Sequence, residues 1–224
     1  MDNQNAKENT VKFYNDNAQA FIEQTFSLEM KSLYEPFIAS LPATTQSQQR
    51  ILDVGCGSGR DSLYFAQLGL DVTAIDGSAA FIDIAKRSND QNNYSPNSYH
   101  QRNAYRSNID WQHCTFEDIH QRNWQKQFMG IWACASLLHV PYAELTLLID
   151  HLIDTLVDDG VFYASFKYGN SERVADKRFF CDMNEERWQA IKRKLNHTFD
   201  DTFWLTEDQK GDKDEMWFNI LIKR

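Results

Sequence analysis

Short apolar runs alternate with segments of helical periodicity along most of this chain. Apolar residues that recur every three or four positions predict amphipathic helices, and short continuous apolar runs predict buried strands. The runs that we interpret as strands occupy residues 51–54, 70–76, 109–114, 129–135 and 161–166. Strand and helix alternate from residue 51 to residue 199, and this order favours a parallel sheet with helices on both faces.

The N-terminal region contains no run of the strand type. Its apolar residues keep helical spacing from Val11 to Leu41, Pro42 ends the segment, and a polar linker covers residues 43–49. We therefore predict a helical cap over residues 1–42 and an α/β domain over residues 43–224, which together form one structural unit.

The C-terminal region also departs from the alternation. A helix is predicted over residues 184–195, followed by two short strands at 202–205 and 216–222 with no helix between them. Strands joined by a short loop are antiparallel neighbours. The predicted fold is thus α/β and doubly wound, with a mostly parallel sheet of seven strands and an antiparallel last strand.

Several residues indicate where helices begin and end. Ser58 and Asp61 have the spacing of a capping box, which predicts a helix start at that point. Pro141 suits the first position of the next long helix, and Gly160 is predicted to end it. Residues 88–108 are rich in Asn, Ser, Gln and Tyr, and we interpret them as a surface loop or an insertion.

Composition narrows the class of protein. The chain of 224 residues is 42% hydrophobic and 13% aromatic, which suits one globular domain. A formal net charge of −9 argues against a nucleic-acid partner. Its four cysteines form no C-x-x-C pair, so neither a zinc site nor a disulfide framework is predicted. No signal peptide or membrane span is recognisable, and we expect a cytoplasmic protein with no metal and no membrane partner.

The most informative stretch is a glycine turn between the first strand and its helix. The strand ends at Asp53-Val54, and Gly55, Gly57 and Gly59 follow at alternate positions. Glycines at a helix start let a ligand approach the backbone N–H groups. Asp76 ends the next strand about twenty residues on, the spacing at which a carboxylate takes two ribose hydroxyls. A solvated acid at a strand end is the alternative for Asp76.

These residues resemble a known family. Ile-Leu-Asp-Val-Gly-Cys-Gly-Ser-Gly at 51–59 and Val-Thr-Ala-Ile-Asp-Gly-Ser at 72–78 are similar to the first two motifs of class I S-adenosylmethionine-dependent methyltransferases, which have a Rossmann-like fold. The Gly-Cys-Gly-x-Gly-Arg form, with Gly-Ile-Trp-Ala-Cys-Ala-Ser-Leu-Leu-His-Val-Pro at 130–141, resembles the small tellurite-resistance-like group. The resemblance implies methyl transfer from S-adenosyl-L-methionine, with S-adenosyl-L-homocysteine as product.

The resemblance also implies roles for particular residues. Those expected to hold the cofactor are Asp53, Gly55, Cys56 and Gly57 at the methionine part, Asp76 at the ribose, Gly77, Phe116 and Glu117 at the adenine, and Cys134 at the amino group. Thr115 occupies the position at which many relatives have an aspartate that accepts a hydrogen bond from the adenine amino group. In this chain Glu117 or the main chain would take over that role. Tyr14 is a candidate to face the sulfonium, with core packing as its alternative.

Two residues are candidates for catalysis. His139 follows the fourth strand and could act as general base, but a helix-capping or packing histidine before Pro141 is the interpretation that we favour, because many substrates need no base. Lys167, just past the fifth strand, could recognise an anionic acceptor with Arg173 and Arg178 downstream. Taken separately, each of the two arginines is interpreted as solvated surface charge. We therefore expect a small-molecule acceptor, and an anionic one would suit these basic residues.

Other functions remain open from the sequence. A tellurite-type oxyanion methyltransferase and a non-catalytic module that binds S-adenosylmethionine both fit the same motifs. A nicotinamide-dependent dehydrogenase is disfavoured by Asp53 and by glycines at alternate positions. The acidic balance lowers the case for a protein or RNA methyltransferase. Nothing in the sequence indicates the methylated atom or the oligomeric state.

Overall fold

The computed structural model of this protein describes residues 3–43, 49–90, 109–208 and 215–224. Most of the predicted linker at 43–49 and most of the polar segment at 88–108 lie outside the described residues.

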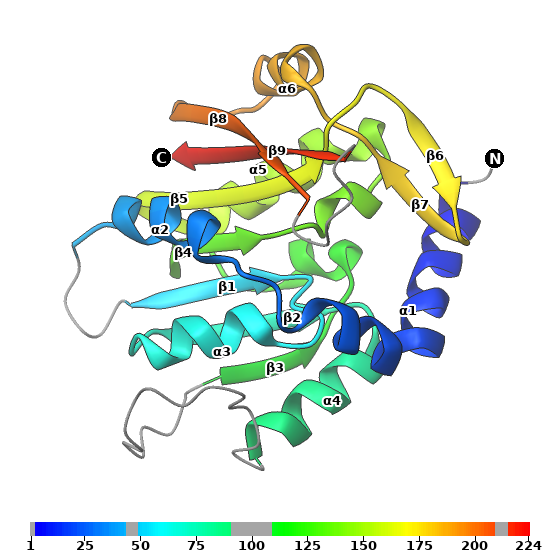
Figure 1. The fold of residues 1–224 in the computed structure, drawn as a ribbon. Coiled ribbons are helices and arrows are strands. Elements are labelled where there is room, and N and C mark those ends of the chain that lie inside the picture. Colours follow the sequence, from blue (N-terminus) through cyan, green and yellow to red (C-terminus); the bar gives the residue numbers. More distant parts are fainter. Residues whose placement is uncertain (1–2, 44–48, 91–108, 209–214) are drawn as a thin grey trace.

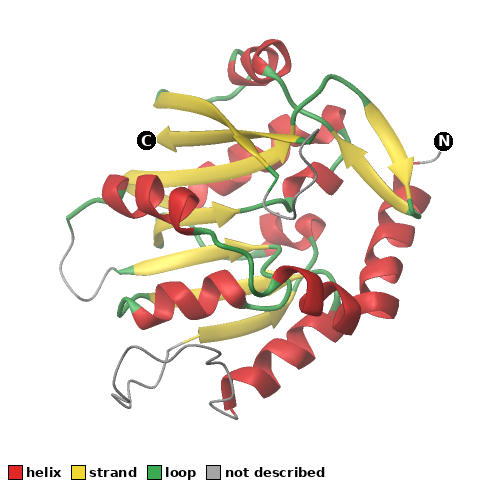
Figure 2. Ribbon diagram, in the orientation of Figure 1, coloured by secondary structure: helices red, strands yellow, loops and turns green. Residues whose placement is uncertain are grey.

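A seven-stranded sheet forms the centre of the described part of the chain (Figures 1 and 2). Its strands are β1 (Arg50–Val54), β2 (Asp71–Asp76), β3 (Ile109–His113), β4 (Phe128–Ala133), β5 (Leu156–Lys167), β8 (Asp200–Glu207) and β9 (Met216–Lys223). Their spatial order is β3-β2-β1-β4-β5-β9-β8. The first five are parallel, and β9 runs antiparallel to both of its neighbours. The predicted fold class is confirmed.

Helices cover both faces of this sheet. They are α2 (Lys31–Ser40), α3 (Arg60–Gln67) and α4 (Ala79–Asp90) on one face, and α5 (Tyr142–Thr155) and α6 (Glu185–Lys192) on the other. Side chains alternate along β1, so fully buried Ile51 joins the cluster with α2 and α3, whereas Leu52 joins the cluster with α5. The sheet is thus held between two apolar layers, and its carboxyl edge is left for other segments.

The first helix, α1 (Asn3–Thr25), lies beyond the carboxyl ends of the parallel strands (Figure 1). It packs against α4 and against the strand β7 (Arg178–Cys181). The helical segment expected from Val11 to Leu41 is therefore two helices, because α1 ends at Thr25, whose carbonyl accepts a hydrogen bond from Arg60 Nη1 at 2.9 Å. Whether residues 1–42 form a cap distinct from 43–224 stays a prediction.

None of the helices in the described residues is long and apolar enough to cross a membrane.

A hairpin of β6 (Glu172–Ala175) and β7 occupies the charged segment that follows β5. It was not predicted. Its two turn residues, Asp176 and Lys177, both have positive φ, of 49° and 66°. Such a turn normally carries Asn or Gly, and their absence hid the hairpin from sequence reasoning.

Two predicted helix boundaries are wrong. Gly160 does not end α5, which stops at Thr155; it lies inside β5, where a side chain would meet the carbonyl of Val157 at 2.9 Å. The predicted capping box at Ser58 and Asp61 does not form, because Gly59 (φ 80°) is the N-cap of α3 and Asp61 is buried among other partners. A capping box forms instead between Thr115 and Asp118.

Candidate active site

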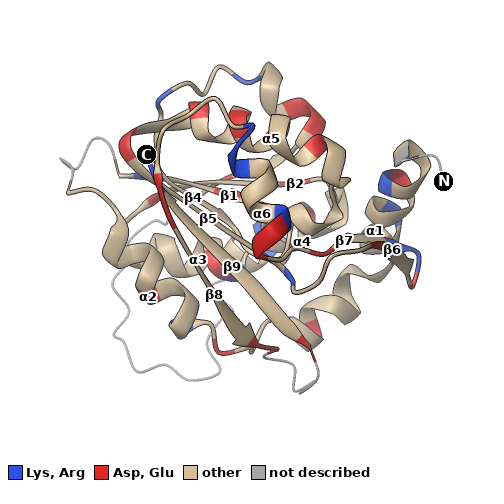
Figure 3. Ribbon diagram, turned by 90° about the horizontal axis from the view of Figure 1, so that it is seen from above, with Lys and Arg blue, Asp and Glu red and all other residues tan. Residues whose placement is uncertain are grey.

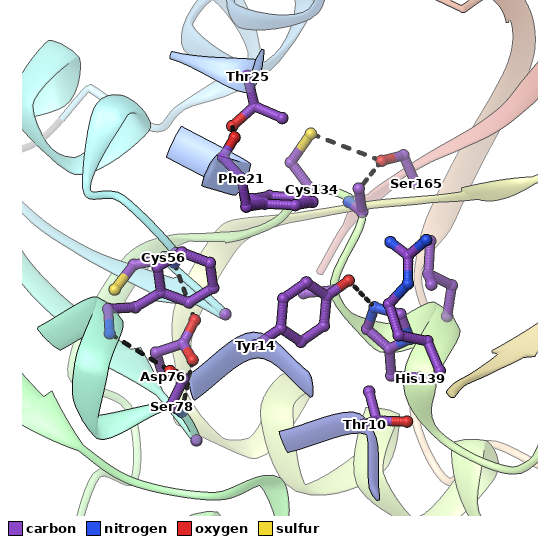
Figure 4. Close-up of a pocket in the computed structure, with 18 of the residues that line it drawn as sticks. Thr10, Tyr14, Phe21, Thr25, Cys56, Asp76, Ser78, Cys134, His139 and Ser165 are labelled. Carbon is purple, nitrogen blue, oxygen red and sulfur yellow. Dashed lines mark hydrogen bonds between the residues drawn. The ribbon is translucent and has the colours of Figure 1, made fainter. Parts of the chain in front are cut away.

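A cavity of about 910 Å³ lies at the carboxyl edge of the sheet, under α1 (Figure 4). Of the twelve residues proposed from the sequence as cofactor-binding or catalytic, all except Asp53 line it: Tyr14, Gly55, Cys56, Gly57, Asp76, Gly77, Phe116, Glu117, Cys134, His139 and Lys167. We call the part formed by Gly55, Gly57 and Asp76 the turn side. The part formed by Tyr14, His139 and Arg178 is the hairpin side.

The glycine turn presents bare backbone to the cavity. Gly55 (φ 75°) and Gly57 (φ 52°) both adopt left-handed conformations that favour glycine. A Cβ on Gly55 would lie 2.4 Å from the Cβ of Ser136, whereas a Cβ on Gly57 would meet no atom within 4 Å. Gly55 therefore lets the turn pack against the segment after β4, and Gly57 leaves room for a ligand.

Asp76 closes the turn side from β2. Its Oδ2 accepts a hydrogen bond from the N–H of Gly57 at 2.9 Å, and its Oδ1 accepts from the N–H of Ser78 at 2.7 Å. Burial raises the pKa of this carboxyl to about 6, against the opposing effect of those two bonds. Each carboxylate oxygen retains a free lone pair, so Asp76 is able to accept two hydroxyl groups from a ligand.

Asp53, which we expected at the methionine part of the cofactor, lies outside the cavity lining. It is buried, and its Oδ2 accepts from Ser62 Oγ at 2.5 Å. Burial, reinforced by the charge of Asp61, raises its pKa well above the usual value. In this structure Asp53 supports the glycine turn from beneath, and its role toward a cofactor stays a prediction.

Arg60 and Asp61 line the cavity although sequence reasoning gave them no ligand role. Asp61 accepts hydrogen bonds from Tyr34 Oη at 2.6 Å, from Trp132 Nε1 at 2.8 Å and from Arg60 Nε at 2.6 Å. Burial alone would raise the pKa of Asp61, but the Arg60 charge and these bonds hold it below its usual value. The only sequence feature that could have indicated this position is the Gly-Arg-Asp run at 59–61, where α3 begins directly after the glycine turn.

The segment after β3 lies across the turn side from the glycines. Glu117 forms an ion pair with Lys7 of α1, with 2.7 Å between Nζ and Oε1. Thr115 caps its own short helix through Asp118. A Cβ on Gly77 would lie 3.5 Å from Val11, which brings α1 close to this point. The residues expected at an adenine are therefore together, but the Glu117 carboxylate already has a partner.

Tyr14 and His139 meet on the hairpin side (Figure 4). The distance from Tyr14 Oη to His139 Nε2 is 2.8 Å, and His139 Nδ1 lies 2.6 Å from the carbonyl oxygen of Phe179. A carbonyl oxygen only accepts, so Nδ1 carries the proton and Nε2 accepts from the tyrosine hydroxyl. Burial lowers the pKa of His139 to about 4, and the imidazole is neutral at pH 7.

The two basic residues of the hairpin side differ in how their charge is balanced. Lys167 is ion-paired with Glu215 and lies 5.2 Å from the ring centroid of Phe180. Arg178, at the first position of β7, lies 5.1 Å from the same ring and 6.0 Å from that of Tyr14. Figure 3 shows basic segments on this hairpin beside α1. The arginine interpreted from sequence as surface charge is thus part of the cavity wall.

The cysteines of the cavity are not nucleophiles. Burial raises the pKa of Cys134 to about 12 and that of Cys56 well above its usual value, so both are thiols at pH 7. Cys134 Sγ lies 3.6 Å from Ser165 Oγ, which also accepts from the N–H of Ala135 at 2.8 Å.

Comparison with known proteins agrees with this architecture. Residues 51–160 match the family described as a methyltransferase domain. The chain is 25% identical to the ubiquinone biosynthesis O-methyltransferase of Actinobacillus pleuropneumoniae over 190 residues, which cover 71% of this chain and 75% of that protein.

Two similar solved structures show the same fold. Magnesium protoporphyrin IX methyltransferase from Synechocystis PCC 6803, with bound S-adenosylhomocysteine, has a TM-score of 0.70 at 14% identity, covering 98% of this chain and 99% of that chain. Burkholderia thailandensis 1,6-didemethyltoxoflavin-N1-methyltransferase, also with S-adenosylhomocysteine, has a TM-score of 0.67 at 17% identity, covering 97% and 86%. Neither comparison identifies the tellurite-resistance-like group, which stays a prediction. Residues 51–160, which carry the glycine turn and Asp76, are thus similar to a methyltransferase domain, and the described sheet has the Rossmann-like fold.

Proposed function

We propose that this protein transfers a methyl group from S-adenosyl-L-methionine to a small-molecule acceptor that carries negative charge. The observation that carries the proposal is the arrangement of Asp76 and Gly57. The Asp76 carboxylate can accept two hydroxyl groups, and a Cβ on Gly57 beside it would meet no atom within 4 Å, in a cavity of about 910 Å³. Pockets of this size hold cofactor-sized ligands.

The residues of the turn side fit the cofactor. Asp76 would take the ribose hydroxyls, Gly55 and Gly57 would allow the amino-acid part to approach the backbone, and Phe116 would flank the adenine. Arg60 is a further candidate for the cofactor's carboxylate, because it lines the same cavity. When bound, S-adenosylmethionine supplies a methyl carbon already activated by its positively charged sulfur, so the main task of the protein is to position the acceptor.

On the hairpin side, His139 can act as a general base through the hydroxyl of Tyr14. Both ring nitrogens of His139 have partners within the protein, so the imidazole reaches an acceptor only through the hydroxyl of Tyr14. Because the imidazole is neutral and Nε2 is the accepting atom, Tyr14 can take a proton from the acceptor while it passes its own to His139. In this proposal His139 acts through Tyr14 and not directly on the acceptor.

An anionic acceptor is supported by the charge of the same wall. Arg178 lines the cavity on the hairpin side beside the Phe180 ring, and its ion-pair partner Asp176 is exposed, whereas Lys167 next to it is ion-paired with Glu215. Positive charge that borders a concave, partly apolar site attracts anions.

Calorimetric titration tests the proposal. S-adenosylhomocysteine is expected to bind the wild-type protein and NAD is not; the reverse result would replace the methyltransferase with a dehydrogenase. Transfer of a labelled methyl group from S-adenosylmethionine to small carboxylates, phosphates and a tellurite salt then separates an enzyme from a binding module. Labelled protein or RNA in the same assay would overturn the small-molecule assignment.

A further inference from the structure

Three cations surround the ring of Phe180, and two of them are neutralised by buried or half-buried acids. Lys167 pairs with Glu215, and Arg173, 5.3 Å from the ring, pairs with the buried carboxylate of Asp182. The third cation, Arg178, has one ion-pair partner within the described part of the chain, Asp176 at 3.5 Å, whose side chain is 79% exposed. Exposed ion pairs contribute little because water screens them. The charge of Arg178 is therefore the least compensated of the three.

One donor of Arg178 is buried without a partner. Its Nε has no hydrogen-bond partner among the described residues, while the side chain as a whole is 20% exposed and lines the cavity. A buried donor without an acceptor is destabilising, and native structures contain few of them. The aromatic rings of Phe13 and Phe180 hold the guanidinium at 4.7 and 5.1 Å, which limits where that donor points.

The backbone before Arg178 is strained. Asp176 and Lys177 occupy the left-handed region as consecutive residues, a conformation that is unfavourable for residues with a Cβ. The hairpin is nevertheless closed by direct pairing of Ala175 with Arg178. Thr10 of α1 accepts a hydrogen bond from the next residue, Phe179, at 2.9 Å. Strain of this kind persists where the surroundings fix a residue for function.

We infer that Arg178 is the residue that binds a carboxylate group of the methyl acceptor, through its planar guanidinium. The inference rests on the proposed function and deepens it by naming the anion site. The planar guanidinium matches a carboxylate with two parallel hydrogen bonds, which an ammonium cannot do. The guanidinium also faces the Tyr14 hydroxyl, whose pKa it lowers against the larger effect of burial. The bound carboxylate therefore lies beside the Tyr14–His139 pair, on the hairpin side.

The test uses the full chain saturated with S-adenosylhomocysteine. Benzoate, acetate, phenyl phosphate and inorganic phosphate are titrated while the arginine Nε–H resonances are followed by NMR, the signal of Arg178 being assigned from its loss in Arg178→Lys. We expect benzoate to shift that signal, and Arg178→Gln to weaken benzoate binding at least tenfold. Arg178→Lys is expected to restore less than half of the lost affinity, because it keeps the charge and loses the planar pair of donors.

Lys177→Gln is the matched control, since it removes the same charge from the adjacent, exposed position of the turn. It is expected to leave benzoate binding within twofold of wild type. Equal losses in Arg178→Gln and Lys177→Gln, no response to either carboxylate, or binding of the phosphates alone would each overturn the carboxylate site. Thermal unfolding and S-adenosylhomocysteine binding are measured in every variant. If S-adenosylhomocysteine does not bind the wild-type protein, the proposed function is wrong. If it binds and no carboxylate does, only the assignment of Arg178 as the carboxylate-binding residue is wrong.

Discussion

The two sides of the cavity are built in different ways. The turn side comes from one short stretch of the chain: Gly55, Gly57 and Asp76 lie within 22 residues, the glycines directly after β1 and Asp76 at the end of the neighbouring strand β2. The hairpin side joins Tyr14 of α1, His139 after β4 and Arg178 of β7, which are far apart in sequence. A ligand common to many proteins can be held by fixed backbone, whereas an acceptor that differs between proteins is contacted by exchangeable side chains on connecting segments.

If the turn side depends on backbone geometry, a single methyl group at Gly55 should have the largest effect. Gly55→Ala forces a left-handed alanine and places its Cβ 2.4 Å from the Cβ of Ser136. We expect the free energy of unfolding to fall by about 3 kcal/mol or more, with S-adenosylhomocysteine binding lost. Denaturant unfolding and calorimetry measure these two quantities.

Gly57→Ala is the matched control for Gly55→Ala. It has the same kind of φ but meets no atom within 4 Å. Its cost in stability should be about 1 kcal/mol, while cofactor binding is impaired because the methyl group enters the ligand space. Equal destabilisation by the two substitutions would show that conformation alone, and not contact with Ser136, governs the turn.

The hairpin side should instead respond to pH through His139. Its folded pKa of about 4 lies below the unfolded value of 6.5, so the unfolded chain binds the proton first as pH falls. The stabilising contribution of neutral His139 is complete above pH 6.5 and is lost progressively toward pH 4. The total change is about 3 kcal/mol.

Asp76 has the opposite effect on stability. Its pKa in the folded protein is about 6, above the usual 3.8, so the folded state binds the proton more readily and becomes relatively more stable as pH falls. The measurement is therefore the difference in unfolding free energy between wild type and His139→Asn, which retains a donor for Phe179, at pH 7 and at pH 4.5. The difference should shrink as pH falls. The exposed His120→Asn should show no such trend, and a constant difference for His139 would contradict the buried, neutral imidazole.

Asp76→Asn should reduce cofactor binding with a smaller effect on stability. The amide keeps one accepting oxygen, so one of the two hydroxyl contacts and the charge are lost. We expect S-adenosylhomocysteine binding to weaken by about 2 kcal/mol, measured by calorimetry. Asp83→Asn, an exposed acid on α4, is the control. An unchanged dissociation constant for Asp76→Asn would place the ribose elsewhere in the cavity.

The contrast between the two sides also explains what sequence could reveal. The glycine turn and Asp76 were predictable because positive-φ glycines and a strand-end acid leave a local pattern. The β6–β7 hairpin was not, because Asp176 and Lys177 occupy a turn that other residues usually fill. Arg178 was interpreted as surface charge since its neighbour Phe13, on α1, is brought to it only by tertiary packing. Asp53 belonged to a recognisable motif, yet burial directs it to Ser62.

The smallest expected effect concerns how α1 is fixed to the hairpin side. Thr10 is buried; its Oγ1 donates to the carbonyl of Ala6 and accepts from the N–H of Phe179 at 2.9 Å. Thr10→Val keeps the shape and leaves that N–H without its acceptor, which should lower the free energy of unfolding by about 1 kcal/mol. Because Phe179 also supplies the carbonyl for His139, the same variant should weaken benzoate binding more than S-adenosylhomocysteine binding. Thr25→Val, whose hydroxyl only donates within α1, is the control. If Thr10→Val weakens the binding of benzoate and of S-adenosylhomocysteine equally, α1 holds the turn side and the hairpin side as one unit. The two sides would then differ in how they are built but not in how they are stabilised.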